Sequence, residues 1–242
     1  MSQVEHRRRP KICTIDPDAP CSTCELRGKL HCTRGEKSNT IGFYSVLLLH
    51  MFFSIVALGI ATYFSGIWWS IPVYVIYWGV YQLYVELIIH CPHCPYWDEN
   101  SEEIICLPNC GIKKPTWRWI RPYLKHNPKP YSKAEKALLH LFNNFTMFFG
   151  LGCLAYAAYH NFHWIMIPAA LLLVLVSVRF ILFLTRRFCH ACANFSCPLN
   201  RVPKPTVDAF LTKNPYMGKA WEQCGYRIDS TSSASSLRDQ SR

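Results

Sequence analysis

Cysteine carries most of the potential chemistry in this chain. The sequence contains 13 cysteines, and all except Cys153 lie outside its long apolar stretches. They fall into three groups of four: Cys13, Cys21, Cys24 and Cys32; Cys91, Cys94, Cys106 and Cys110; and Cys189, Cys192, Cys197 and Cys224. Four thiolates form the complete inner shell of a structural zinc ion or an iron–sulfur cluster, so each group is a candidate metal site. We interpret the solitary Cys153 as a small packing residue.

The middle group has the spacing of two metal-binding knuckles, Cys91-x2-Cys94 and Cys106-x3-Cys110. Two such knuckles, folded face to face, give four sulfur ligands in a tetrahedral arrangement. Proline directly follows Cys91, Cys94 and Cys197, as it follows the last ligand of a bacterial ferredoxin run, but the full ferredoxin spacing is missing. Paired knuckles favour zinc, and the sequence leaves zinc and iron–sulfur clusters both open.

The other two groups are less regular. The N-terminal group is nearly symmetric about Cys21-x2-Cys24, in a segment too short to bury a core, so it would need a metal to be ordered. In this N-terminal group, His31 could replace Cys32 as a ligand. The third group offers three close ligands in Cys189-x2-Cys192-x4-Cys197, and we expect the distant Cys224 to complete it, with His190 as the competing fourth ligand. A metal site with three cysteines and an open coordination position would instead indicate a reactive site and not a structural one.

The elements that position these cysteines are long apolar stretches. A helix needs about 20 apolar residues to cross the hydrocarbon core of a bilayer. Stretches such as Val46–Ile60 and Ala169–Val178 are apolar all round, which argues against a soluble helical bundle. The sequence therefore predicts four membrane spans: Ile41–Phe64, Trp68–His90, Ala137–Tyr159 and Trp164–Thr185.

The distribution of Lys and Arg predicts the orientation of these spans. No Lys or Arg lies between Lys37 and Lys113, or between Lys136 and Arg179, whereas the N-terminal arm, the middle segment and the C-terminal tail are basic. The positive-inside rule then places both termini and the middle segment in the cytoplasm. The net charge of +11 is explained as a basic surface facing anionic lipid headgroups, so no nucleic acid is expected as a partner. Disulfides are rare in the reducing cytoplasm, which favours metal binding by the grouped cysteines.

The chain also has an internal repeat. Each half runs through two apolar stretches into a Cys-x2-Cys pair, and the motifs Lys114-Pro115-Thr116 and Lys204-Pro205-Thr206 follow at equivalent places. We therefore predict an all-α polytopic membrane protein with four transmembrane helices arranged as two tandem helical hairpins, each followed by a small Cys-rich cytoplasmic metal-binding segment. The expected divisions are an N-terminal arm (1–40), hairpin 1 (41–90), a Cys-rich loop with an interfacial segment (91–136), hairpin 2 (137–188), a second Cys-rich segment (189–228) and a disordered tail (229–242).

Three ionisable residues lie within the predicted spans: His50, Glu86 and Arg179. Such residues are costly in a bilayer and are usually paired or functional. The structural explanation, which we favour, is an ion pair between Glu86 and Arg179 across the second and fourth helices. The functional alternative is a quinone or proton site formed by all three residues.

Aromatic and basic residues alternate in the middle segment. Next to a membrane span, this pattern is typical of a segment that lies among the lipid headgroups. The residues are Trp117, Trp119, Tyr123 and Tyr131, with Lys114, Arg118, Arg121 and Lys125. At the opposite ends of the spans, Trp68, Trp69 and Trp164 are expected to form a second aromatic belt.

No recognisable catalytic motif is present, so the sequence leaves open whether the protein is an enzyme. It favours a non-catalytic membrane metalloprotein with three metal sites of four cysteines each, acting as a scaffold or accessory subunit for an unidentified protein partner. The alternative is a membrane subunit that carries electrons through iron–sulfur clusters to a quinone. A metal transporter is a third class, but only His50, Glu86 and Arg179 are available to line a path.

Overall fold

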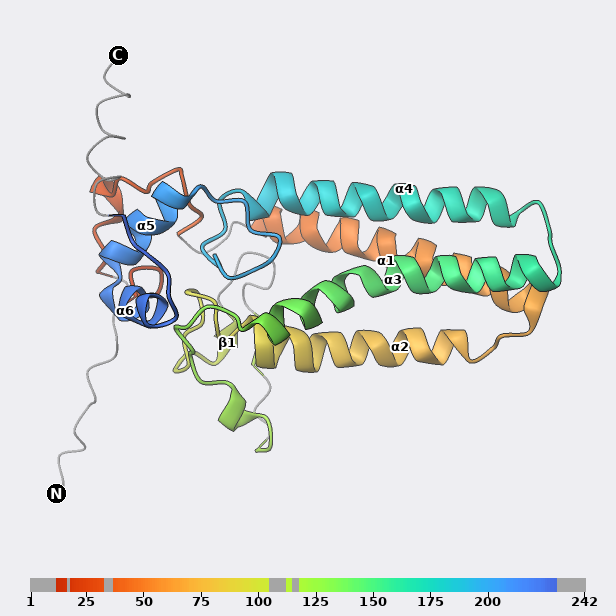
Figure 1. Cartoon of the computed structure of the whole chain (residues 1–242), viewed down its shortest axis with the longest axis horizontal. Coiled ribbons are helices and arrows are strands. Elements are labelled where there is room, and N and C mark those ends of the chain that lie inside the picture. The colour runs from red at the N-terminus through yellow and green to blue at the C-terminus, as the bar shows by residue number, and fades with distance from the viewer. Residues whose placement is uncertain (1–11, 17, 33–36, 105–111, 115–117, 230–242) are drawn as a thin grey trace, which may run out of the picture.

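The protein was analysed as a computed structural model, which describes residues 12–16, 18–32, 37–104, 112–114 and 118–229. Four long helices lie side by side, and the short elements gather as a cap at one end of them (Figure 1). The long helices are α1 (Lys37–Ser65), α2 (Ser70–Val80) with its continuation η2 (Tyr81–His90), α3 (Lys133–His160), and α4 (Met166–Leu184) with its continuation η4 (Thr185–Cys189). The predicted Cys106, Cys110 and Trp117, and the predicted tail from residue 230 onward, lie outside the described residues.

Helices of membrane-spanning length are confirmed. Among the described residues, Ile41–Ser65, Ser70–His90 and Met166–Cys189 are each long and apolar enough to cross a bilayer. Helix α3 gives a fourth if its two parts, Lys133–Phe145 and Met147–His160, are counted together across a 46° bend. Beside this bend the Asn144 amide donates to the His140 carbonyl at 2.8 Å, and side-chain bonds to the preceding turn often bend helices.

Helices α1, α3 and α4 contact one another closely at the end away from the cap. The core there contains many small residues, among them Ala57, Ala61 and Ala157, all almost fully buried. A Cβ atom on Gly150 of α3 would lie only 2.7 Å from Leu173 of α4, so this glycine permits the approach of the two helices. Small residues at helix contacts are characteristic of membrane bundles, where close packing replaces the hydrophobic effect as the driving force.

The second helix of each half changes from α to π geometry just before its Cys-x2-Cys pair. In the first half, the Cys91 amide donates to the Glu86 carbonyl five residues earlier, at 2.7 Å. In the second half, the π-helix η4 ends at Cys189 itself. Such wide turns are rare and occur often at functional sites. They were not predicted from the sequence.

The cap combines segments from three parts of the chain. It contains η1 (Cys21–Thr23), the two-residue strands β1 (Glu103–Ile104) and β2 (Ile112–Lys113), η3 (Arg121–Tyr123), α5 (Lys204–Lys213) and α6 (Pro215–Gln223). One buried core joins the N-terminal arm through Ile12 and Leu26, the first half through Tyr96, and the second half through Phe210 and Trp221. The cysteine segments are therefore parts of one folded unit.

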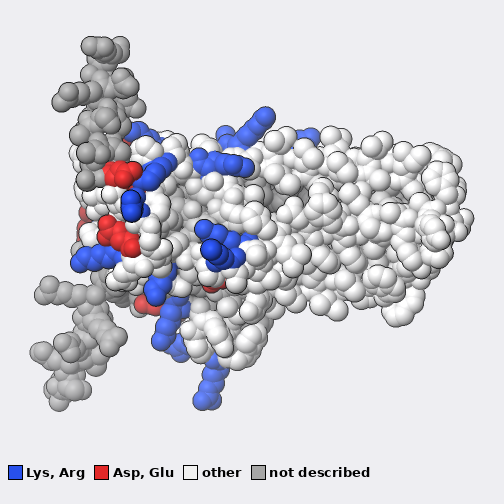
Figure 2. Space-filling view, viewed as in Figure 1, with Lys and Arg blue, Asp and Glu red and all other residues white. Residues whose placement is uncertain are grey.

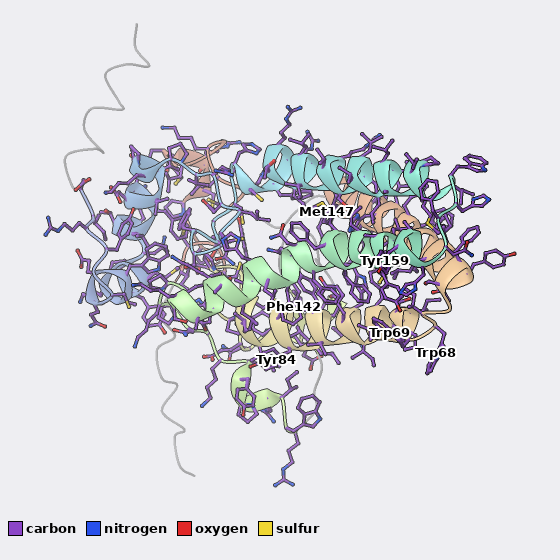
Figure 3. All side chains as sticks on the ribbon, turned by 45° about the vertical axis from the view of Figure 1, so that its right-hand side comes forward. Trp68, Trp69, Tyr84, Phe142, Met147 and Tyr159 are labelled. Atoms are coloured by element: carbon purple, nitrogen blue, oxygen red, sulfur yellow. The ribbon has the colours of Figure 1, made fainter. Side chains whose placement is uncertain are left out.

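Charge and aromatic residues divide the molecule as the sequence predicted. The Lys and Arg side chains visible in Figure 2 gather over the cap and the cap-side half of the bundle, while the far half of the bundle is free of them on this face. At the far end, Trp68, Trp69 and Tyr159 stand at the helix ends (Figure 3). Trp68 and Trp164 are 72% and 68% exposed, as expected for residues of an aromatic belt at a membrane surface.

Candidate functional site: a cavity lined by cysteines

The cap covers a cavity of about 230 Å³ between the ends of the four long helices. The lining comes from all four helices and from both Cys-x2-Cys segments. Its helical part contains Tyr44 and His50 of α1, Trp78 of α2, Asn143 of α3 and Phe180 of α4. The cavity is thus the place where the two halves of the chain meet.

Five of the predicted metal ligands line this cavity: Cys91, Cys94, Cys189, Cys192 and Cys197. We expected each half to gather its own cysteines. The expected partners of Cys91 and Cys94, which are Cys106 and Cys110, lie outside the described residues, so this pairing stays a prediction. The described cysteines of both halves line one cavity. Among the described residues, no three Cys, His, Asp or Glu side chains converge closely enough to hold a metal ion. Of the cysteines that line the cavity, Cys189, Cys192 and Cys197 are free thiols.

Burial governs the ionisation of the thiols in the cap. The pKa of Cys192 is raised to about 11, mainly by burial and to a smaller extent by the neighbouring Cys189. Burial also raises the pKa of Cys197 to about 12, with Cys192 and Glu86 adding to the effect. Without a nearby cation these thiols are neutral at pH 7, and a bound metal would be needed to deprotonate them.

Two of the three predicted intramembrane residues reach the cavity. His50 is only 4% exposed and stacks on Phe180, with ring centroids 5.3 Å apart. Glu86 lies on η2 and contributes to the lining together with His50.

The predicted ion pair between Glu86 and Arg179 is wrong. Arg179 is exposed on the outside of α4 and does not line the cavity, and no ion pair among the described residues joins the two side chains. The physical reason is the length of the arginine side chain, whose apolar stem can lie along the helix while the charged end extends towards the headgroups.

Aromatic residues of α2 and η2 form one wall of the cavity and are held in place by α3. The Tyr77 hydroxyl donates to the Phe142 carbonyl at 2.7 Å, and the Tyr81 hydroxyl donates to Asn143 Oδ1 at 3.2 Å. Tyr77 also stacks on Phe145 at 4.5 Å between ring centroids. This wall is therefore preorganised and predominantly apolar.

A buried polar network connects the two halves beside the cavity. The Tyr131 hydroxyl lies 3.0 Å from His90 Nδ1 and accepts a hydrogen bond from Asn194 Nδ2 at 3.0 Å. It also donates to the His90 carbonyl at 3.2 Å. Asn194 is 1% exposed, and its Oδ1 has no hydrogen-bond partner within the described part of the chain.

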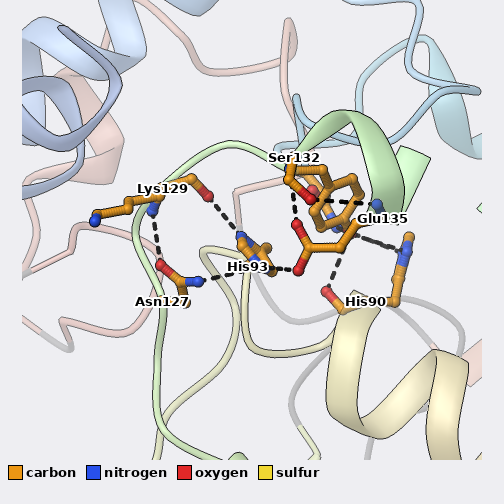
Figure 4. A network of polar contacts seen from close by, with 8 residues as sticks. His90, His93, Asn127, Lys129, Ser132 and Glu135 are labelled. Carbon is orange, nitrogen blue, oxygen red and sulfur yellow. Dashed lines mark hydrogen bonds and ion pairs between the residues drawn. The ribbon is translucent and has the colours of Figure 1, made fainter. Parts of the chain in front are cut away.

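A second network fixes the start of α3 against the first Cys-x2-Cys turn (Figure 4). The buried His93 donates from Nδ1 to the Lys129 carbonyl at 2.6 Å, and its Nε2 lies 3.2 Å from Asn127 Nδ2 and 3.3 Å from Glu135 Oε1. Glu135 also forms a reciprocal capping pair with Ser132, at 2.7 and 3.2 Å. Helix α3, which lines the cavity through Asn143, is therefore held against the turn between Cys91 and Cys94.

The remaining predicted ligands lie in the rest of the cap. Cys13, Cys24 and Cys32 border the apolar core of the cap. The pKa of Cys32 is raised to about 12, mainly by burial and to a smaller extent by the other N-terminal thiols. Cys21 is exposed. The thiols of this group are thus near enough to influence one another, although no three of them form a metal site in the described structure.

The expected role of Cys224 as the fourth ligand of the third group is not supported. Cys224 is exposed at the end of α6 and does not line the cavity. The distance along the chain gave no indication that α6 would carry it away from the other three. The two alternative histidine ligands instead lie near each other, with the rings of His31 and His190 5.8 Å apart.

Sequence reasoning missed the aromatic wall and the network around Tyr131 and Asn194. A signal for the wall was present, because Trp78, Gln82 and Glu86 follow one another at intervals of four residues and therefore share a helix face. Comparisons with protein-family models, with curated proteins and with solved structures each return no match, so the functional argument rests on this geometry.

Proposed function

We propose that this chain is an integral membrane electron-transfer protein. In this proposal the cysteines of the cap hold an iron–sulfur centre, and a lipid-soluble carrier of the quinone class binds in the cavity beneath it. The observation that carries the proposal is the single cavity lined both by five cysteines and by His50 and Glu86. A structural scaffold has no need of a cavity that connects thiols with protonatable side chains inside a helical bundle.

The lining suits a flat, mostly apolar ligand with few polar atoms. Small-molecule sites are typically concave, apolar and aromatic, with a small number of polar groups that fix orientation. Tyr77, Trp78 and Tyr81 supply the aromatic surface, while His50 and Glu86 supply the polar groups. Electron carriers that dissolve in the bilayer could enter between the helices without crossing water.

The ligands we propose are Cys91, Cys94, Cys189, Cys192 and Cys197. A centre bound to them would pass electrons from a reduced donor protein to the quinone. The choice of iron–sulfur over zinc follows from the proposed activity, because zinc has no redox chemistry. The described thiols would draw together on metal binding, since the binding free energy of such sites is largely folding free energy. Cys106 and Cys110 are further candidate ligands and lie outside the described residues.

Reduction of a quinone consumes protons as well as electrons, and His50 and Glu86 would provide them. Carboxyl and imidazole groups are common proton donors and acceptors at catalytic sites. Glu86 lies on the same π-helix as His90, which belongs to the buried network with Tyr131 and Asn194. This network offers a hydrogen-bonded connection from the cavity into the cap.

For the topology, we propose four spans in two hairpins with both termini and the cap in the cytoplasm. This is supported by the concentration of Lys and Arg at the cap end and by the positive-inside rule. An impermeant thiol reagent applied outside intact cells should then leave the grouped cysteines unmodified. Labelling of Cys21 or Cys224, both exposed, would contradict this orientation.

The electron-transfer proposal is tested by the absorbance spectrum and metal content of protein purified without oxygen. Iron–sulfur protein is brown and contains iron and sulfide in stoichiometric amounts. Colourless protein that carries stoichiometric zinc would overturn the proposal. It would favour the second candidate, a non-catalytic scaffold, which is supported by the single cap core shared by the N-terminal arm and both halves.

A further inference from the structure

A second concave surface lies on the outside of the bundle, away from the cysteine cavity. It is an apolar groove of about 360 Å³, lined by one face of α2 and η2 and by Trp119 from the middle segment. The helical residues of the groove are Ile76, Gly79, Val80, Leu83, Tyr84 and Ile88. Trp119 is 62% exposed and Tyr84 is 49% exposed, so both present large aromatic surfaces to the surroundings.

The groove has the length of one half of a bilayer. From Ile76 to Ile88 the helix rises about 18 Å, compared with about 15 Å for the hydrocarbon of one leaflet. Its Ile88 end lies towards the cap, because the apolar stretch ends at His90. An acyl chain lying along α2 and η2 would therefore have its headgroup beside the middle segment.

The middle segment carries positive charge beside the place where the headgroup would lie. Residues 118–120 form turns that lead into the 3-10 helix η3, which begins at Arg121. Arg118 and Arg121 are both exposed, and they flank Trp119 and Ile120 in sequence. Ile120 is fully buried in a core with Leu87 and Cys91, which fixes the arginine pair relative to η2.

We propose that this groove binds one anionic phospholipid. One acyl chain lies between Trp119 and the face of α2 and η2, and Arg118 and Arg121 hold the phosphate. Arginine suits this role because its planar guanidinium group can donate two hydrogen bonds to one phosphate. A free phosphate would use the arginines alone, whereas a lipid also requires the apolar groove. This inference is independent of the proposed electron transfer.

The test is native mass spectrometry of the full-length protein after equilibration with phosphatidylglycerol or phosphatidylcholine. The wild-type protein should retain one phosphatidylglycerol in preference to phosphatidylcholine. An Arg118→Gln/Arg121→Gln variant should bind phosphatidylglycerol about thirty-fold more weakly, at about 1 kcal/mol for each arginine. Trp119→Ala should weaken the same binding although the charge is unchanged, which separates lipid from free phosphate.

An Arg186→Gln/Arg187→Gln variant is the matched control. It removes the same number of exposed charges from the end of the helix formed by α4 and η4, which is not part of the groove. It should keep the preferred phosphatidylglycerol. Equal losses in the two double variants would show only a general effect of surface charge and would overturn the specific site. Retention of the lipid by the Arg118/Arg121 variant would overturn it as well.

Discussion

At the scale of single residues, the structure separates two charges that the sequence suggests are partners. Glu86 lines the cavity, whereas Arg179 is exposed on the outer side of α4. Sequence reasoning identified both residues as unusual in a bilayer, but their partners depend on the rotation of each helix about its axis. That rotation is set by packing between helices, which the hydropathy of an all-apolar stretch does not encode. The contacts of Tyr131 and Asn194 escaped prediction for a similar reason, since they join residues 63 positions apart.

The Tyr131 hydroxyl should contribute measurably to stability. Tyr131→Phe removes the acceptor of the Asn194 amide and the partner of His90 in a buried site. Leaving buried polar groups without partners costs about 1–3 kcal/mol, so the thermal midpoint should fall. Tyr123→Phe is the control, because Tyr123 is 60% exposed and its change should have little effect. Equal midpoints for the two variants would mean that the network does not stabilise the fold.

The pH dependence of stability should include a contribution from His126. The pKa of His126 is lowered to about 4, mainly by burial and to a smaller extent by the nearby His93. Because the unfolded state has the higher pKa, about 6.5, it binds the proton first as the pH falls. Stability should therefore decrease from about pH 6.5 down to about pH 4, by at most about 3 kcal/mol. In His126→Gln this part of the pH profile should be flatter, and an unchanged profile would refute the assignment.

At the scale of elements, helix ends show where local sequence is sufficient. Helix α3 begins at Lys133, four residues before the predicted span, because Ser132 and Glu135 form a capping box that is readable in the sequence. The end of α1 is also determined by local sequence, since Gly66 ends the helix with a φ of 71°. By contrast, no such local signal marks the π-helices before both Cys-x2-Cys pairs.

Gly218 should be required for the packing of α6 against α5. A Cβ atom at this position would lie 2.7 Å from the Leu211 carbonyl oxygen, which belongs to the backbone and cannot rotate away. Gly218→Ala should thus destabilise the cap by about 1–3 kcal/mol, although helix propensity alone predicts a gain of about 1 kcal/mol. Gly79→Ala on α2 is the control, because nothing lies within 4 Å of its Cβ position. If Gly218→Ala raised the thermal midpoint, the described contact between the two helices would be wrong.

At the scale of the whole molecule, sequence reasoning predicted the division into an apolar bundle and a basic, cysteine-rich end. That division follows from composition, because apolar helices and charged segments require different solvents. The sequence did not predict that the cysteine segments share one cap core and one cavity. These contacts join the N-terminal arm to α5 and α6 and one half to the other, for example Cys13 to Asn214, and no local pattern specifies contacts of such range. The cavity is a consequence of this assembly.

The central claim is that the cavity holds a quinone beside the cysteine centre and that Glu86 supplies protons for the reduction of this quinone. The most direct measurement is the rate at which added quinone reoxidises the reduced, metal-loaded protein under anaerobic conditions. Glu86→Gln should slow this rate by about 100-fold or more, the usual effect of losing a proton donor. Arg179→Gln, which removes an equally unusual charge outside the cavity, should leave it within about twofold. Equal rates in wild type and Glu86→Gln, or no reoxidation of the wild-type protein by quinone, would contradict the claim.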